Sequence, residues 1–117
     1  MVKESPITEH QHQKNFVQWF RLQYPGILLY AIPNGGKRNI GTAKKLKDTG
    51  TVPGIPDLHA PILNLWIEMK VVKGGYLSQD QKQILAYLED IGDTVIIGRG
   101  FDDAKKKVEE FMKECGL

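Results

Sequence analysis

The sequence lacks the features that would assign it to several special classes of protein. With only one cysteine, Cys115, a single chain can form neither a disulfide framework nor a cysteine-rich zinc site. No apolar run approaches the ~20 residues that cross a bilayer. The opening residues, MVKESPITEHQHQ, contain no apolar core of the kind that a secretory signal needs. We therefore expect a cytoplasmic protein that makes no use of a membrane.

An excess of charge of one sign is also missing. The 16 Lys and Arg residues nearly balance the 14 Asp and Glu residues, which leaves a net charge of +2. If the protein binds nucleic acid, its basic residues must therefore be gathered on one face. Hydrophobic residues make up 41% and charged residues 26% of the 117 residues, as in an ordinary globular protein. This length favours a single domain over residues 1–117.

Helical and strand patterns alternate along the chain. Helical patterns cover residues 8–24, 40–49, 78–92 and 104–115; apolar strands cover 27–32, 65–72 and 94–98, with a further strand from residue 57. Ser78 and Gln81 match a capping box, and Asn64 is the best turn residue between neighbouring strands. The pattern predicts an α/β fold with a mixed sheet, in the order helix, strand, helix, strand, strand, helix, strand, helix.

Some of these patterns make specific claims about burial. We expect residues 27–32 to form a buried strand, and Cys115 to be a small core residue on the apolar stripe of the last helix. The stripe of the third helix consists of Ile84, Leu85, Leu88 and Ile91. In the second helix, Ile40, Ala43 and Leu46 are expected to face inward.

The strand LWIEMKVV carries an acid and a base on one face. Because side chains alternate along a strand, Glu68 and Lys70 lie on the face opposite to the apolar residues Leu65, Ile67, Met69 and Val71. Taken alone, this pair fits a solvated surface ion pair. Two observations favour a functional site instead. Trp66 and Val72 flank the pair on the same face, and Asp57 begins the strand that should run back beside Glu68.

Two carboxylates brought together repel each other, and one stays protonated at neutral pH unless a positive charge lies between them. A divalent cation removes that repulsion, and oxygen ligands suit Mg²⁺ or Mn²⁺. Lys70 would point at the same place, where an ammonium group can orient water or stabilise charge on a phosphate. Asp57, Glu68 and Lys70 therefore form a constellation suited to phosphodiester hydrolysis.

The spacing of these residues resembles a known nuclease motif. Pro56-Asp57, ten residues, and then Glu68-Met69-Lys70 look like the PD-(D/E)XK motif. The wider series PNGGKR (33–38), LKDTG (46–50), GIPDL (54–58), WIEMK (66–70) and LSQDQ (77–81) resembles the VRR-NUC (virus-type replication-repair nuclease) family of that superfamily. The resemblance covers about residues 9–98. It implies a restriction-endonuclease-like core and Mg²⁺- or Mn²⁺-dependent cleavage of DNA. In several members the action is selective for branched DNA, including four-way (Holliday) junctions, and similar stand-alone members occur in phages and bacteria.

The resemblance also suggests further site residues. It places a first-helix glutamate, here Glu9, near the metal, and Gln81 in the site; the carbonyl of Met69 would assist Asp57 and Glu68 as a metal ligand. The alternative for Glu9 is a polar helix start that only reaches solvent. The alternative for Gln81 is its role in the capping box, which we expect to compete with a role in the site.

A glycine-containing loop ends in two cations. Asn34, Gly35, Gly36, Lys37 and Arg38 would let a DNA backbone approach closely, and Lys44, Lys45 and Lys47 would extend the basic surface. An ordinary solvated turn and a wet helix face are the alternatives. His10 and His12 point roughly 200° apart on a helix and cannot share a metal ion. His59 shares a strand face with Asp57 and is at most a supporting residue of the site.

These observations lead to one main hypothesis and two alternatives. The main hypothesis is a Mg²⁺- or Mn²⁺-dependent endodeoxyribonuclease, with DNA repair as the expected process. A four-way junction needs paired cuts, so a homodimer is expected. One alternative is a nuclease-like fold that binds DNA or protein without cutting. The other is an unrelated α/β module whose Glu68–Lys70 pair is solvated.

Overall fold

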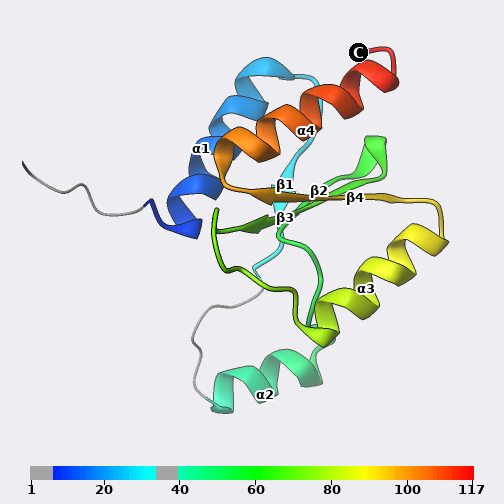
Figure 1. The fold of residues 1–117 in the computed structure, drawn as a ribbon. Coiled ribbons are helices and arrows are strands. Elements are labelled where there is room, and N and C mark those ends of the chain that lie inside the picture. The colour runs from blue at the N-terminus through cyan, green and yellow to red at the C-terminus, as the bar shows by residue number, and fades with distance from the viewer. Residues whose placement is uncertain (1–6, 34–39) are drawn as a thin grey trace, which may run out of the picture.

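A mixed sheet of four strands organises the protein (Figure 1). The computed structural model describes residues 7–33 and 40–117. Its elements are α1 (Glu9–Gln23), β1 (Tyr30–Ala31), α2 (Ile40–Asp48), β2 (Leu58–Ala60), the short 3₁₀ helix η1 (Pro61–Leu63), β3 (Leu65–Lys70), α3 (Gln79–Asp90), β4 (Thr94–Arg99) and α4 (Phe101–Glu114). This is the order of helices and strands that the sequence predicted. None of the helices in the described ranges is long and apolar enough to cross a membrane.

The strands lie in the order β1-β2-β3-β4. The pairs β1–β2 and β2–β3 are antiparallel, whereas β3 and β4 are parallel and are connected through α3. In the register of β2 with β3, Leu58 is opposite Ile67. Asp57, the residue just before β2, is therefore brought opposite Glu68, as the sequence predicted.

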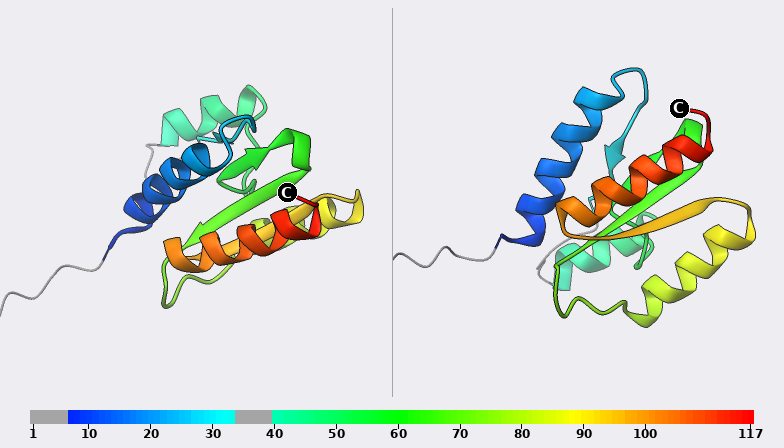
Figure 2. Two further views of the ribbon diagram at one scale, coloured as in Figure 1. Left: turned by 90° about the horizontal axis from the view of Figure 1, so that it is seen from above. Right: turned by 45° about the horizontal axis from the view of Figure 1, so that its top comes forward.

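Helices cover both faces of the sheet. Helices α1 and α4 lie together on one face, and α3 lies on the other (Figures 1 and 2). Under α1 and α4 the sheet contributes Leu65, Ile67 and Met69, all without solvent exposure. The helices contribute Phe16, Phe20, Ala104, Val108 and Met112 to the same core. The alternation of side chains along β3 thus buries one face and leaves Glu68 and Lys70 on the other.

The local signals at element ends are confirmed. Ser78 and Gln81 form the predicted capping box at the start of α3, and Thr8 and Gln11 form a second one at α1. Asn64 adopts a left-handed conformation (φ 49°) in the turn between β2 and β3. Pro61 is accommodated there because it begins η1, where a missing amide hydrogen does no harm.

Three expectations about burial are wrong. Residues 27–32 contribute only the two-residue strand β1, whose residues are both exposed; of this segment only Leu29 is buried in the core, whereas Leu28 is 64% exposed. Cys115 is exposed because it caps the C-terminus of α4, beyond the last turn that packs on the sheet. Ile91 is 57% exposed for the same reason at the end of α3, where Leu88 is the buried residue. Hydrophobic periodicity does not show where a helix runs past the surface that it covers.

Candidate active site

Asp57 and Glu68 form a carboxyl pair at the junction of β2 and β3. The Oδ2 atom of Asp57 accepts a hydrogen bond of 2.8 Å from the backbone N–H of Met69, which fixes this carboxyl group against the edge of β3. A hydrogen bond between the two carboxyl groups contributes to their pKa shifts, raising the pKa of Glu68 and lowering that of Asp57. Glu68 is only 4% exposed. The alternative in which Glu68 belongs to a solvated surface pair is therefore wrong.

The electrostatics of this pair favour a bound proton. The pKa of Glu68 is raised to about 8, first by burial and then by the nearby Asp57, while Lys70 opposes the shift. Burial also raises the pKa of Asp57, although the hydrogen bond from the Met69 amide works in the opposite direction. Near neutral pH the pair therefore retains a proton, because two buried carboxylates cannot both ionise without a compensating positive charge.

Gln81 connects the pair to Lys70. Its Nε2 donates to Oε1 of Glu68 (3.1 Å), and its Oε1 accepts from Nζ of Lys70 (3.2 Å). The same Oε1 accepts from the backbone N–H of Ser78 (2.9 Å), which is the capping-box bond. The expectation that capping and the site compete for Gln81 is wrong, because an amide oxygen has two lone pairs and can accept both bonds.

The loop before Asp57 packs directly on the start of α3. Gly54 has φ +90°, and a Cβ atom placed there would lie 2.5 Å from the carbonyl carbon of Asp80 and 2.8 Å from the amide nitrogen of Gln81. Only glycine combines this conformation with such a close approach. Gly54 therefore sets how near the Asp57 segment lies to the helix that carries Gln81.

A cleft of about 590 Å³ opens over these groups. Its lining includes Asp57, Glu68, Gln81 and, from the first turns of α1, Glu9 and Gln13. Burial raises the pKa of Glu9, and Asp57 raises it as well, whereas Lys70 lowers it. The structure thus brings Glu9 to the same cleft as the carboxyl pair, as the sequence predicted, although the side chain is largely exposed.

The donor set fits a hard divalent cation, although the ligands are not gathered into a closed cluster. Among residues 7–33 and 40–117, no three His, Cys, Asp or Glu side chains lie close enough together to hold a metal ion. The buried pair that retains a proton is a place where a cation could take over the role of that proton. The Met69 amide points to Asp57. Because the N–H and C=O of one strand residue face the same side, its carbonyl also faces that edge.

Two of the three histidines have partners outside the carboxyl pair. Nδ1 of His12 accepts a hydrogen bond of 2.9 Å from the backbone N–H of Phe101, so this α1 residue caps α4. Sequence reasoning missed this contact, and no local signal points to it. His59 bonds to the hydroxyl of Tyr30 (2.7 Å) and stacks on Trp66 (3.8 Å between centroids), outside the cleft lining. His10 lines the cleft.

The predicted basic surface is only partly described. Lys44, Lys45 and Lys47 are exposed on α2. The loop Asn34–Arg38 and the side chains of Ile40 and Ala43 lie outside the described residues. Leu46 is half-buried and lines a hollow together with Ile32 and Val52. A role of these residues in DNA binding stays a prediction.

A comparison with solved structures supports this fold. No family model matches the chain, and no curated protein is similar to it in sequence. A solved structure described as "VRR_NUC domain protein" superimposes with a TM-score of 0.76 at 22% sequence identity, over 94% of this chain and 92% of the other. The protein therefore has the fold of a VRR-NUC domain. The restriction-endonuclease-like fold that the sequence resemblance implied is confirmed.

Proposed function

We propose that the protein is a Mg²⁺- or Mn²⁺-dependent endodeoxyribonuclease that cleaves branched DNA such as four-way junctions. The observation that carries the proposal is the buried Asp57–Glu68 pair, whose proton a cation can replace, with Lys70 held beside it through Gln81. The likeness of the fold to a VRR-NUC domain supports the nuclease assignment.

Four groups would hold the metal: the carboxylates of Asp57 and Glu68, the carbonyl of Met69 and, from α1, Glu9. All are oxygen donors, which Mg²⁺ and Mn²⁺ prefer. When bound, the ion would act as a Lewis acid on the scissile phosphate and lower the pKa of a water molecule.

The remaining chemistry belongs to the side chains of this protein. The ammonium group of Lys70 orients the attacking water and stabilises negative charge on the phosphate. Gln81 keeps this ammonium in place because its amide is bound at both ends. The water oxygen bonds to phosphorus, the bond from phosphorus to the 3′ oxygen breaks, and that oxygen takes up a proton. The products are a 5′-phosphate and a 3′-hydroxyl.

The proposal also includes contacts to the DNA backbone and a homodimeric assembly. Lys37 and Arg38, with the amides of Asn34, Gly35 and Gly36, would contact the DNA backbone, and Lys44 and Lys45 would extend that contact. A homodimer would match the two-fold character of a four-way junction. Light scattering of the protein with junction DNA in chelator should give the mass of two chains per junction; a single chain per junction would contradict this part. We expect the protein to act in the cytoplasm, or in that of the host if a phage encodes it.

The test is a cleavage assay on labelled single-stranded, duplex, flap and four-way junction DNA with Mn²⁺, Mg²⁺ or chelator. We expect metal-dependent cleavage that Lys70→Ala abolishes and Lys113→Ala leaves intact, because Lys113 is an exposed residue in the last turn of α4. Binding without cleavage in any metal would overturn the nuclease proposal and favour the non-cleaving binding module.

A further inference from the structure

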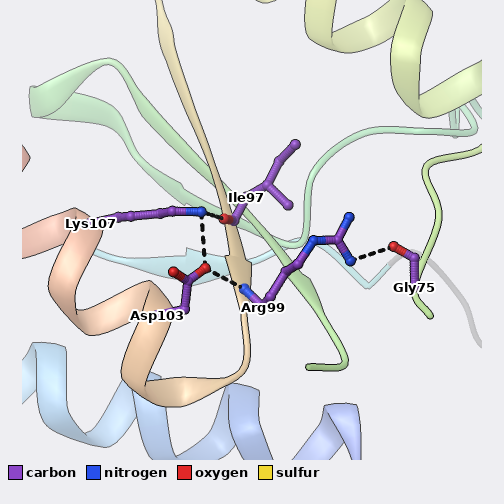
Figure 3. Close-up of polar contacts among 5 residues, drawn as sticks. All are labelled: Gly75, Ile97, Arg99, Asp103 and Lys107. Atoms are coloured by element: carbon purple, nitrogen blue, oxygen red, sulfur yellow. Dashed lines mark hydrogen bonds and ion pairs between the residues drawn. The ribbon is translucent and has the colours of Figure 1, made fainter. Parts of the chain in front are cut away.

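The loop between β3 and α3, residues 71–78, is anchored next to Lys70. In Figure 3, the guanidinium group of Arg99 reaches from β4 to this loop, where its Nη1 donates a hydrogen bond of 2.7 Å to the carbonyl of Gly75. Arg99 is itself fixed, because its backbone N–H donates to Oδ2 of Asp103 (2.9 Å). In the parallel register Arg99 lies beside Lys70. The loop is therefore tied to the strand that borders the candidate site.

The anchored part of the loop touches the catalytic candidate directly. A Cβ atom at Gly75 would lie 3.3 Å from both Cβ and Cδ of Lys70, so the loop backbone packs on the aliphatic stem of this lysine. Ser78, at the other end, is the N-cap of α3 and is bonded to Gln81. One end of the segment 75–78 thus packs on Lys70. The other end is bonded to Gln81, which is the hydrogen-bond partner of Lys70.

Tyr76 lies between these two anchors and is 87% exposed. A single exposed aromatic residue is common on protein surfaces and needs no explanation by itself. Here, however, the ring follows directly after the residue that packs on Lys70, and Lys73 in the same loop adds an exposed cation. Tyrosine on a fixed backbone offers a large contact surface at a small loss of conformational entropy.

We propose that this loop recognises unpaired DNA. Tyr76 stacks on an unpaired nucleobase beside the scissile phosphate, and Lys73 contacts the neighbouring DNA backbone. This inference rests on the proposed nuclease function and gives it a source of structure selectivity. Bases inside a duplex are already stacked on both faces, so an aromatic side chain can stack only on a base that is unpaired or at an end. Flaps, branch points and single strands would provide such bases.

The first test measures DNA affinity by fluorescence anisotropy in chelator, where no cleavage occurs. Tyr76→Ala should weaken binding of single-stranded and flap DNA by about 5- to 100-fold, the effect of losing one stacked base. Competition by a relaxed, covalently closed circular duplex should change less than about twofold, because such a duplex has neither unpaired bases nor ends. Tyr76→Phe and Tyr76→Trp should bind as the unmodified protein does. Tyr87→Ala is the matched control, because Tyr87 is 61% exposed on α3, outside the loop.

A second readout reports stacking itself. The fluorescence of 2-aminopurine in the unpaired strand should be quenched on binding at one position next to the cleavage site, and Tyr76→Ala should remove this quenching. The inference is overturned if Tyr76→Ala weakens the binding of duplex and flap DNA equally, or if Tyr76→Phe loses as much DNA affinity as Tyr76→Ala. It is also overturned if self-association of the protein depends on Tyr76 while DNA binding does not. If the unmodified protein binds none of these DNAs, the proposed function itself fails. If it binds and cuts DNA but Tyr76→Ala changes nothing, only the inference about the loop fails.

Discussion

Helices α3 and α4 begin in different ways. The start of α3 lines the candidate site, whereas the start of α4 is joined to it only through the backbone, where Gly100 N–H donates to the carbonyl of Lys70. Helix α3 is capped by its own sequence, through Ser78 and Gln81. Helix α4 has Gly100 at the N-cap without a side-chain bond, and the acceptor comes instead from His12 of α1, 89 positions away from Phe101. The first cap orients Gln81 toward Lys70. The second joins α4 to the first turn of α1, three residues after Glu9. A helix start can therefore organise a site either locally or through tertiary contact.

The largest expected effect comes from separating the two roles of Gln81. Gln81→Glu keeps an acceptor for the Ser78 amide and for Lys70 but loses the Nε2 donor to Glu68 and adds a negative charge beside it. We expect kcat on junction DNA to fall by about 10²-fold or more, with little change in the melting temperature. Single-turnover cleavage at saturating Mn²⁺ and calorimetry would measure the two quantities. Full activity of Gln81→Glu would show that only the acceptor matters.

The carboxyl pair beside α3 should make the stability of the metal-free protein depend on pH. Folded Glu68 keeps its proton up to about pH 8, whereas an unfolded glutamate releases it near 4.5. Between these values the unfolded chain binds fewer protons, so the free energy of unfolding falls as pH rises, by at most about 5 kcal/mol for a shift of this size. Below the lower value the contribution is fully present. Urea unfolding in chelator across this range would measure it.

Glu68→Gln is the matched variant for that experiment, because its side chain does not titrate. Its stability should stay nearly constant where that of the unmodified protein declines. An equally steep decline in Glu68→Gln would assign the pH dependence to other groups.

The α4 start should be sensitive to any side chain at Gly100. Its φ is +88°, and a Cβ atom there would lie 2.8 Å from Val72 Cγ2 and 3.2 Å from His12 Cε1. Gly100→Ala should therefore lose about 2 kcal/mol of stability in urea unfolding, from backbone strain and crowding together. Gly92→Ala is the control, because Gly92 has φ +96° but open space around it. It should lose only about 1 kcal/mol; equal losses would show that crowding at Gly100 is unimportant.

The smallest effects should come from removing each cap. Ser78→Ala and His12→Ala should each lose about 1 kcal/mol of stability. His12→Asn should recover most of the lost stability, because its Oδ1 can replace Nδ1 as acceptor, whereas the longer side chain of His12→Gln places its oxygen too far from the backbone of residue 12.

We further expect His12→Ala to weaken Mn²⁺ binding, measured by calorimetry, and to lose this effect in a Glu9→Gln background. An undiminished effect of His12→Ala in that background would show that His12 does not act through Glu9.

Much of the architecture follows from short-range patterns that the sequence makes visible. The capping box at Ser78, the turn at Asn64 and the alternation along β3 each depend on residues within a few positions of one another. The meeting of Asp57 with Glu68 also belongs here, because a short connection between antiparallel strands leaves few possible registers. The order of helices and strands followed from these local rules, whereas the nuclease-like fold was implied by the resemblance of the motif series to a known family.

Only the tertiary structure decided the contacts that make these residues a site. The dual role of Gln81 required the first turn of α3 to approach Glu68 and Lys70, which depends on the packing of Gly54 against that turn. The cap of α4 by His12 required α1 and α4 to dock at one particular offset. The exposure of Cys115 and Ile91 was decided by where each helix leaves the sheet. Sequence periodicity gives the face that an element buries, but the distance between two elements depends on how all their side chains pack together.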